Sequence, residues 1–230
     1  MLITLIDKVF LNNGYEVVIF EHNYDCLIVK LYKPIIALKK AEYYLVIECL
    51  NATNQHADVL LSEWADGLHQ KVRVHPEIER FFSKNCTMII CWPDHAITDK
   101  QIFQLEEDQY NFKKNVITYC LAELEEFETK TNDHTLLQLN KMVADGNRRY
   151  FQRFKEKSAG LKNYYSLLLK IFIKMPFLTY QHESIGLNNL DSSLVESLTA
   201  VELELYEFMQ GISKDLTDEE LMIEFLKRAN

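Results

Sequence analysis

The sequence is poor in the residues that form turns and linkers, with six glycines and four prolines among 230 residues. An all-β chain needs many tight turns, and flexible linkers need glycine, serine or proline, so this scarcity argues against both. The glycines are also scattered, and no GxxxxGK(S/T) phosphate-binding loop is present. We therefore expect regular secondary structure, no nucleotide bound through such a loop, and no cofactor.

Motifs for metal binding and nucleophilic catalysis are lacking as well. The five cysteines include no CxxC pair, and the seven histidines show no HxxxH or HExxH spacing. No GxSxG nucleophile turn occurs. We expect no metal site, no disulfide framework and no catalytic residues.

Long apolar runs are missing too. No segment reaches the roughly 20 apolar residues that span a bilayer, and the first residues lack the cationic region of a signal peptide. With scattered cysteines, this favours a cytoplasmic protein with no membrane contact.

The chain carries a net charge of −9, and 12% of its residues are aromatic. The negative charge argues against general binding of polyanions by the whole chain. Large rings build cores, but they also build protein interfaces. Charge is unevenly distributed, since residues 141–174 hold nine cations and two acids, whereas residues 195–230 hold three cations and nine acids.

The stretch RRYFQRFKEK at 148–157 is both basic and aromatic. On a helix it forms either a solvated cationic face, a surface that docks on an acidic protein, or a contact with nucleic acid. These three interpretations stay open. The residues of this candidate basic patch are Arg148, Arg149, Arg153, Lys155 and Lys157.

The pattern of apolar residues predicts an α+β fold. Residues 1–97 form an α/β-like module with about four strands, and residues 98–230 form a mainly α-helical region. In the module, helices are expected at 2–11 and 57–72, and strands at 15–21, 24–32, 42–50 and 86–92, the first two as a hairpin. Beyond it, helical spacing covers 97–127, 134–146, 148–158, 161–174, 190–210 and 216–229.

The order of elements in the module resembles the PD-(D/E)xK nuclease layout, with Asp25 and Glu48 as candidate metal ligands. The lysine expected two residues after the glutamate is Leu50. A working nuclease is therefore disfavoured unless another lysine, such as Lys30, reaches the site. One alternative is a degenerate relative of these nucleases that binds DNA. In the other, Glu48 has no catalytic role and only ends a buried strand, where it faces a polar edge.

The segment EEDQYNFKKNVITY at 106–119 places three acids before two aromatic residues and two lysines. Acids favour the start of a helix, and the lysines can pair with them. We expect Tyr110 and Phe112 to be largely buried, either in the core of this chain or against a partner.

The same segment resembles the pattern EEDxYxFKKxVxxY found in middle components of bacterial ABC-three-component systems, including the small accessory subunit of Lamassu-type antiphage defence. A proline commonly follows the aspartate in that pattern, whereas this chain has Gln109. The matching residues are Glu106, Glu107, Asp108, Tyr110, Phe112, Lys113, Lys114, Val116 and Tyr119.

This resemblance implies a non-enzymatic adaptor that bridges an SMC-like or Rad50-like ABC ATPase and an effector, often a nuclease. The adaptor would hold the effector inactive until foreign DNA is sensed, and any DNA contact would come through the complex. The resemblance implies that the segment 106–119 contributes to partner binding.

Overall fold

The computed structural model describes residues 1–35, 41–145, 151–152, 155–156 and 162–180, together with 198–199, 202–203 and 206. The chain divides into two compact units, Met1–Gln181 and His182–Asn230. In the second unit, Thr199 and Glu202 cap each other: the Glu202 amide donates to Thr199 Oγ1 at 3.4 Å, and the Thr199 amide donates to Glu202 Oε2 at 2.8 Å.

A five-stranded sheet with the order β1-β2-β3-β4-β5 is the centre of the first unit. The first three strands are antiparallel, and β3, β4 and β5 are parallel. Ile47 of β3 lies opposite Ile90 of β4, which in turn lies opposite Val116 of β5. The strands are β1 (Tyr15–Val18), β2 (Leu27–Pro34), β3 (Tyr43–Cys49), β4 (Cys86–Pro93) and β5 (Lys113–Tyr119).

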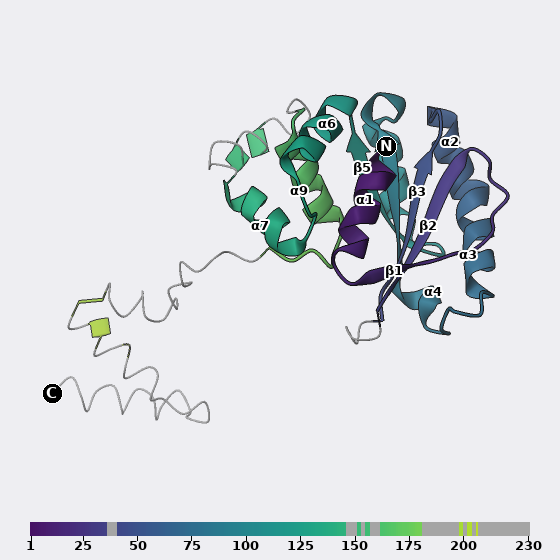
Figure 1. The fold of residues 1–230 in the computed structure, drawn as a ribbon, viewed down its shortest axis with the longest axis horizontal. Helices are drawn as coiled ribbons and strands as arrows, with labels where there is room; N and C mark the ends of the chain where they lie inside the picture. Colours follow the sequence, from purple (N-terminus) through teal and green to yellow (C-terminus); the bar gives the residue numbers. More distant parts are fainter. Residues whose placement is uncertain are drawn as a thin grey trace, which may run out of the picture. The chain divides into compact units, whose positions relative to one another are not determined.

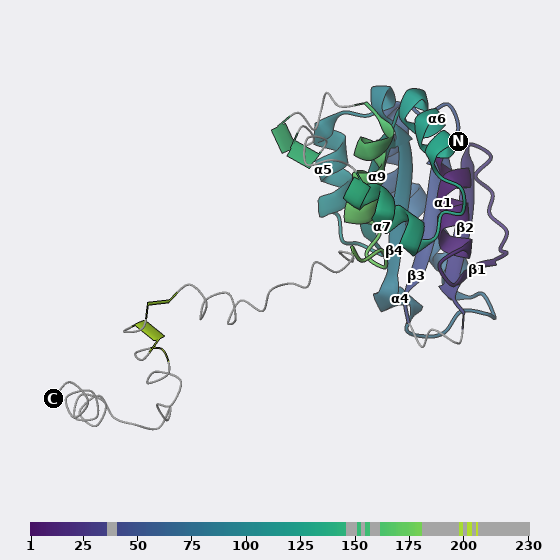
Figure 2. The same cartoon turned by 60° about the vertical axis from the view of Figure 1, so that its left-hand side comes forward.

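Helices cover both faces of the sheet (Figure 1). On one face α1, α6, α7 and α9 lie together, as Figure 2 also shows. The other face is covered by α2, α3, α4 and α5. The helices are α1 (Leu2–Leu11), α2 (Asn54–Val59), α3 (Ala65–Arg73), α4 (Phe82–Asn85), α5 (Asp99–Glu107), α6 (Leu121–Lys130), α7 (Leu136–Asp145) and α9 (Tyr164–Lys174), with a π-helical turn (Leu60–Trp64) between α2 and α3 and a 3₁₀ turn (Asp94–Ala96) after β4.

All seven residues of strand β3 are buried, which shows that other elements cover both faces of this strand. Tyr44 and Val46 point into the core under α1 and α9, whereas Leu45 and Ile47 point into the core under α2 and α3. A strand covered on both sides is typical of the parallel part of a sheet. Within the described residues, no helix is both long and apolar enough to cross a membrane.

The α+β class is confirmed, and the four strands expected before residue 97 are present as β1 to β4. One expectation is wrong: residues 113–119, for which helical spacing predicts a helix, form the fifth strand. The sheet therefore continues past residue 97. Pairing with β4, which begins 27 positions earlier at Cys86, decides the conformation of this segment and outweighs its local pattern.

Candidate functional site

The acids of the segment 106–119 lie at the end of a helix and not at its start, contrary to the expectation from the sequence. Helix α5 begins at Asp99, after Thr98 and Gln101, which cap each other. Glu106 and Glu107 then fall in its last turn, where the helix dipole disfavours acids. Other partners must therefore stabilise these carboxylates.

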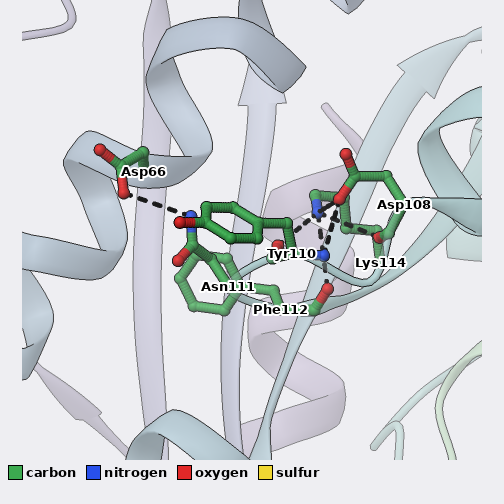
Figure 3. A network of polar contacts seen from close by, with 6 residues as sticks. All are labelled: Asp66, Asp108, Tyr110, Asn111, Phe112 and Lys114. Atoms are coloured by element: carbon green, nitrogen blue, oxygen red, sulfur yellow. Dashed lines mark hydrogen bonds and ion pairs between the residues drawn. The ribbon is translucent and has the colours of Figure 1, made fainter.

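Lys114 is the centre of the segment, and its side chain is 1% exposed. Its Nζ donates to Asp108 Oδ1 at 2.9 Å, to the Asp108 carbonyl at 3.1 Å and to the Tyr110 carbonyl at 2.8 Å (Figure 3). Asp108 Oδ1 also accepts the Tyr110 amide at 2.8 Å. The ammonium group thus donates three hydrogen bonds to the loop that joins α5 to β5. The expected pairing of Lys114 with a preceding acid is confirmed.

The carboxyl group of Asp108 is held in its charged form. Partial burial by itself would raise the pKa of Asp108, but the hydrogen bonds from Lys114 and the Tyr110 amide outweigh it, so the pKa lies below its usual value. At neutral pH Asp108 is therefore a carboxylate that accepts these hydrogen bonds.

The loop turns at Asn111, whose φ of 65° lies in the left-handed region that asparagine tolerates better than most residues. Asn111 Nδ2 donates to Asp66 Oδ1 on α3 at 3.3 Å. The turn directs Phe112 into the core, where it is 2% exposed and contacts His69 edge-on at a centroid distance of 5.2 Å. The predicted burial of Phe112 is confirmed.

Tyr110 behaves differently, because its side chain is 75% exposed. Of the two environments expected for this ring, the core of this chain is excluded, since hydrogen bonds of the Tyr110 amide and carbonyl group fix the backbone with the ring outside. Burial against a partner stays a prediction. Glu107 and Lys113 are exposed as well. The segment therefore has an inward part, which fixes the loop, and an outward part, which is available to a partner.

The outer edge of β5 is occupied by side chains from α5 and α9. Glu106 Oε1 accepts the Val116 amide at 2.8 Å, and the same carboxylate pairs with Lys174 at 2.6 Å. Lys170 donates to the Thr118 carbonyl at 3.0 Å. These contacts satisfy backbone groups that an edge strand otherwise exposes. No local pattern predicts the contacts of Lys170 and Lys174, because α9 is distant along the chain.

The carboxyl ends of the parallel strands, where α/β proteins usually bind ligands, are filled by the start of α1. The carboxylate of Glu48, which is 3% exposed, accepts the Leu2 amide at 3.3 Å and the Ile3 amide at 2.9 Å. The Tyr119 hydroxyl donates to the same carboxylate. Burial and this hydrogen bond raise the pKa of Tyr119. Glu48 is thus a buried helix cap and does not face a polar edge.

The other residues of the nuclease layout are not brought to Glu48. Asp25 is exposed in the turn before β2, and Lys30 pairs with Asp7 at 2.8 Å. Across the described ranges, no three His, Cys, Asp or Glu side chains gather in a way that could hold a metal ion.

One thiol lies near a histidine, with Cys49 Sγ 3.5 Å from His56 Nδ1. The same ring nitrogen lies 3.2 Å from the Thr53 amide, which donates to it at the start of α2. Burial raises the pKa of the Cys49 thiol to about 12. Reactive cysteines, by contrast, have a lowered pKa that favours the thiolate.

A hollow of about 720 Å³ lies beside the loop, at the amino ends of β3, β4 and β5. Its lining includes Glu42, Gln109 and Lys113. This is the end of a parallel sheet opposite to the one that α/β proteins commonly use for ligands.

Most of the candidate basic patch lies outside the described residues, namely Arg148, Arg149, Arg153 and Lys157. Lys155 is described, exposed, and places its Nζ 5.9 Å from the centroid of the Phe151 ring. A role of this patch in binding DNA or an acidic partner stays a prediction.

Comparison with known proteins gives one family. Residues 43–143 match the family model described as ABC-three component (ABC-3C) system Middle Component 1. The matched range runs from β3 into α7 and includes the whole segment 106–119. No curated protein and no solved structure matches the chain.

Proposed function

We propose, from the match of residues 43–143 to Middle Component 1, that this chain is the middle component of an ABC-three-component system. It acts as a non-enzymatic adaptor in antiphage defence of the Lamassu type. It bridges an SMC-like or Rad50-like ABC ATPase and a nuclease effector, and it keeps the effector inactive until foreign DNA reaches the complex.

The family match is the observation that carries this proposal, and the geometry of two sites supports it. At the carboxyl ends of the parallel strands, the carboxylate of Glu48 is engaged by two backbone amides and a tyrosine hydroxyl. Reactive chemistry there would require those bonds to break. At the loop, by contrast, an exposed ring is held on a fixed backbone, which suits a binding surface.

The test is purification of the tagged chain from its native host, followed by identification of the proteins that copurify. We expect an ABC ATPase and a second protein with an effector domain, in constant ratio across a size-exclusion peak. Recovery of the chain alone, at salt concentrations that preserve ordinary complexes, would contradict the adaptor role.

A PD-(D/E)xK-like protein is the second candidate, because α1, β1, β2, β3, α2–α3 and β4 follow one another in the order of that layout. The isolated chain should be incubated with DNA and Mg²⁺ or Mn²⁺. We expect no cleavage. Cleavage that Asp25→Asn abolishes would favour the nuclease, and this variant is suitable because Asp25 is exposed and its loss should not unfold the chain.

A further inference from the structure

Tyr110 presents an aromatic ring to solvent from a backbone that cannot easily move. Its amide donates to Asp108 Oδ1 at 2.8 Å, and its carbonyl accepts Lys114 Nζ at 2.8 Å. The next residue is tied to α3 through Asp66. A buried lysine is costly to desolvate, yet the contacts of Lys114 fix a loop whose Tyr110 side chain is largely exposed.

Such a ring suits the centre of a protein interface. Tyrosine brings a large contact area with few rotatable bonds, and it is enriched among residues that dominate binding energy. Because the backbone is already ordered, binding would lose little conformational entropy there.

The charges around the ring indicate the kind of partner. Asp108 and Glu107 precede Tyr110 in the chain, and Asp66 contacts the residue after it. In Figure 3 the ring lies in the part of the view between Asp66 and Asp108. The charge of Lys114 is directed inward to Asp108, and Lys113 lines the hollow. Asp108 is already paired with Lys114, so the carboxylates beside the ring that contact neutral groups or solvent are those of Asp66 and Glu107, next to the exposed Lys113.

We infer that Tyr110, with Asp66 beside the loop and Glu107 three positions before the ring in the chain, is a docking surface for an arginine-bearing segment of a partner protein. The guanidinium group stacks on the ring, while the carboxylates match its charge. The inference rests on the proposed function in one respect: the partner is another subunit of the same complex.

The experiment uses the complex purified through the tagged full-length chain. The photoreactive amino acid p-benzoylphenylalanine replaces Tyr110, and mass spectrometry locates the cross-linked residues. We expect a segment of another subunit that carries arginine within a few positions of the cross-link.

Affinity is then measured by biolayer interferometry with that purified subunit. Tyr110→Ala should weaken binding about 2- to 30-fold, the range that corresponds to a cation–π contact, whereas Tyr110→Phe should stay within about twofold of the original because it keeps the ring. Glu107→Gln should reduce the salt dependence of binding. Leu137→Ala removes an exposed apolar side chain on the opposite face of the sheet and serves as the control.

Two results would overturn the inference alone: unchanged affinity of Tyr110→Ala in a complex that assembles, or a cross-linked segment without arginine near the cross-link. A cross-link to a second copy of this chain would show self-association at this surface instead. If no subunit copurifies at all, the proposed function fails, and the inference fails with it.

Discussion

Lys114 and Lys113 are neighbours with the same chemistry and opposite environments. The first is buried with three oxygen partners within 3.1 Å, and the second is exposed. Replacement of Lys114 by methionine leaves the Asp108 carboxylate and two carbonyl groups without their donor. A buried polar group left without its partner costs on the order of 1–3 kcal/mol. Water replaces part of the lost contacts here, because Asp108 is partly exposed and Tyr110 is largely exposed.

We therefore expect Lys114→Met to lower the free energy of unfolding by about 2–3 kcal/mol, measured by urea denaturation. Lys113→Met is the matched control and should change it by no more than about 0.5 kcal/mol. Equal losses in the two variants would show that the buried contacts of Lys114 contribute nothing specific.

Gly67, inside α3, gives a second prediction. An alanine in a helix is normally about 1 kcal/mol more favourable than a glycine. Here an added Cβ would overlap the hydroxyl oxygen of Tyr24 and come within 3.3 Å of its Cζ. Because the ring must shift, Gly67→Ala should destabilise the fold by about 1–2 kcal/mol.

The partner of that contact provides the check. Tyr24→Phe removes the overlapping oxygen, so the double variant should recover most of the melting temperature lost by Gly67→Ala. If Gly67→Ala instead raises the melting temperature, the packing of Tyr24 on α3 is not as described.

At the scale of elements, the edge of β5 depends on Glu106, which accepts the Val116 amide at 2.8 Å. In Glu106→Ala this amide loses its partner and the pairing with Lys174 is also lost. We expect hydrogen exchange at Val116 to accelerate at least tenfold, measured by NMR. Glu107→Ala alters the exposed neighbour and should leave that rate unchanged; similar rates in both variants would argue against this edge contact.

The elements that the sequence predicts well are those whose local pattern and long-range pairing agree. Runs such as those at 42–50 and 86–92 are apolar and β-branched, and they became β3 and β4. The segment 113–119 begins with two lysines and lies among helical patterns, and its strand conformation follows from pairing with β4. No local rule predicts that Lys114 is buried, because lysine is usually exposed.

The candidate site was predictable in a similar, partial way. The resemblance directed attention to the segment 106–119, and the burial of Phe112 follows from its apolar side chain. The exposure of Tyr110 depends on the turn at Asn111 and on contacts to α3. Those contacts join residues more than forty positions apart in the chain, and a local sequence pattern does not predict contacts over such a separation.

At the scale of the whole molecule, one buried histidine and two partly buried ones predict how stability depends on pH. Burial lowers the pKa of His134, and the nearby Lys8 lowers it further, whereas Asp133 and Glu128 act in the opposite direction. Burial also lowers the pKa values of His22 and His69. Below the ordinary value of about 6.5, the unfolded chain then binds more protons than the folded chain, so stability should fall as the pH drops below that value.

His134→Asn tests this dependence, because asparagine tolerates the positive φ of 56° at this position. The difference in unfolding free energy between pH 8 and pH 5.5, obtained from urea titrations, should be smaller in the variant than in the original chain. An identical difference would mean that protonation of His134 does not contribute.

The capping of β5 also has a consequence for the order in which the chain folds during synthesis. Glu106 precedes β5, but Lys170 and Lys174 belong to α9, which leaves the ribosome only after the whole of α6 and α7. At ordinary translation rates this delay is on the order of seconds. During this delay the outer edge of β5 has no contact from α9. The nascent chain is then most prone to pair with another strand at this edge, until α9 is synthesised and packs there.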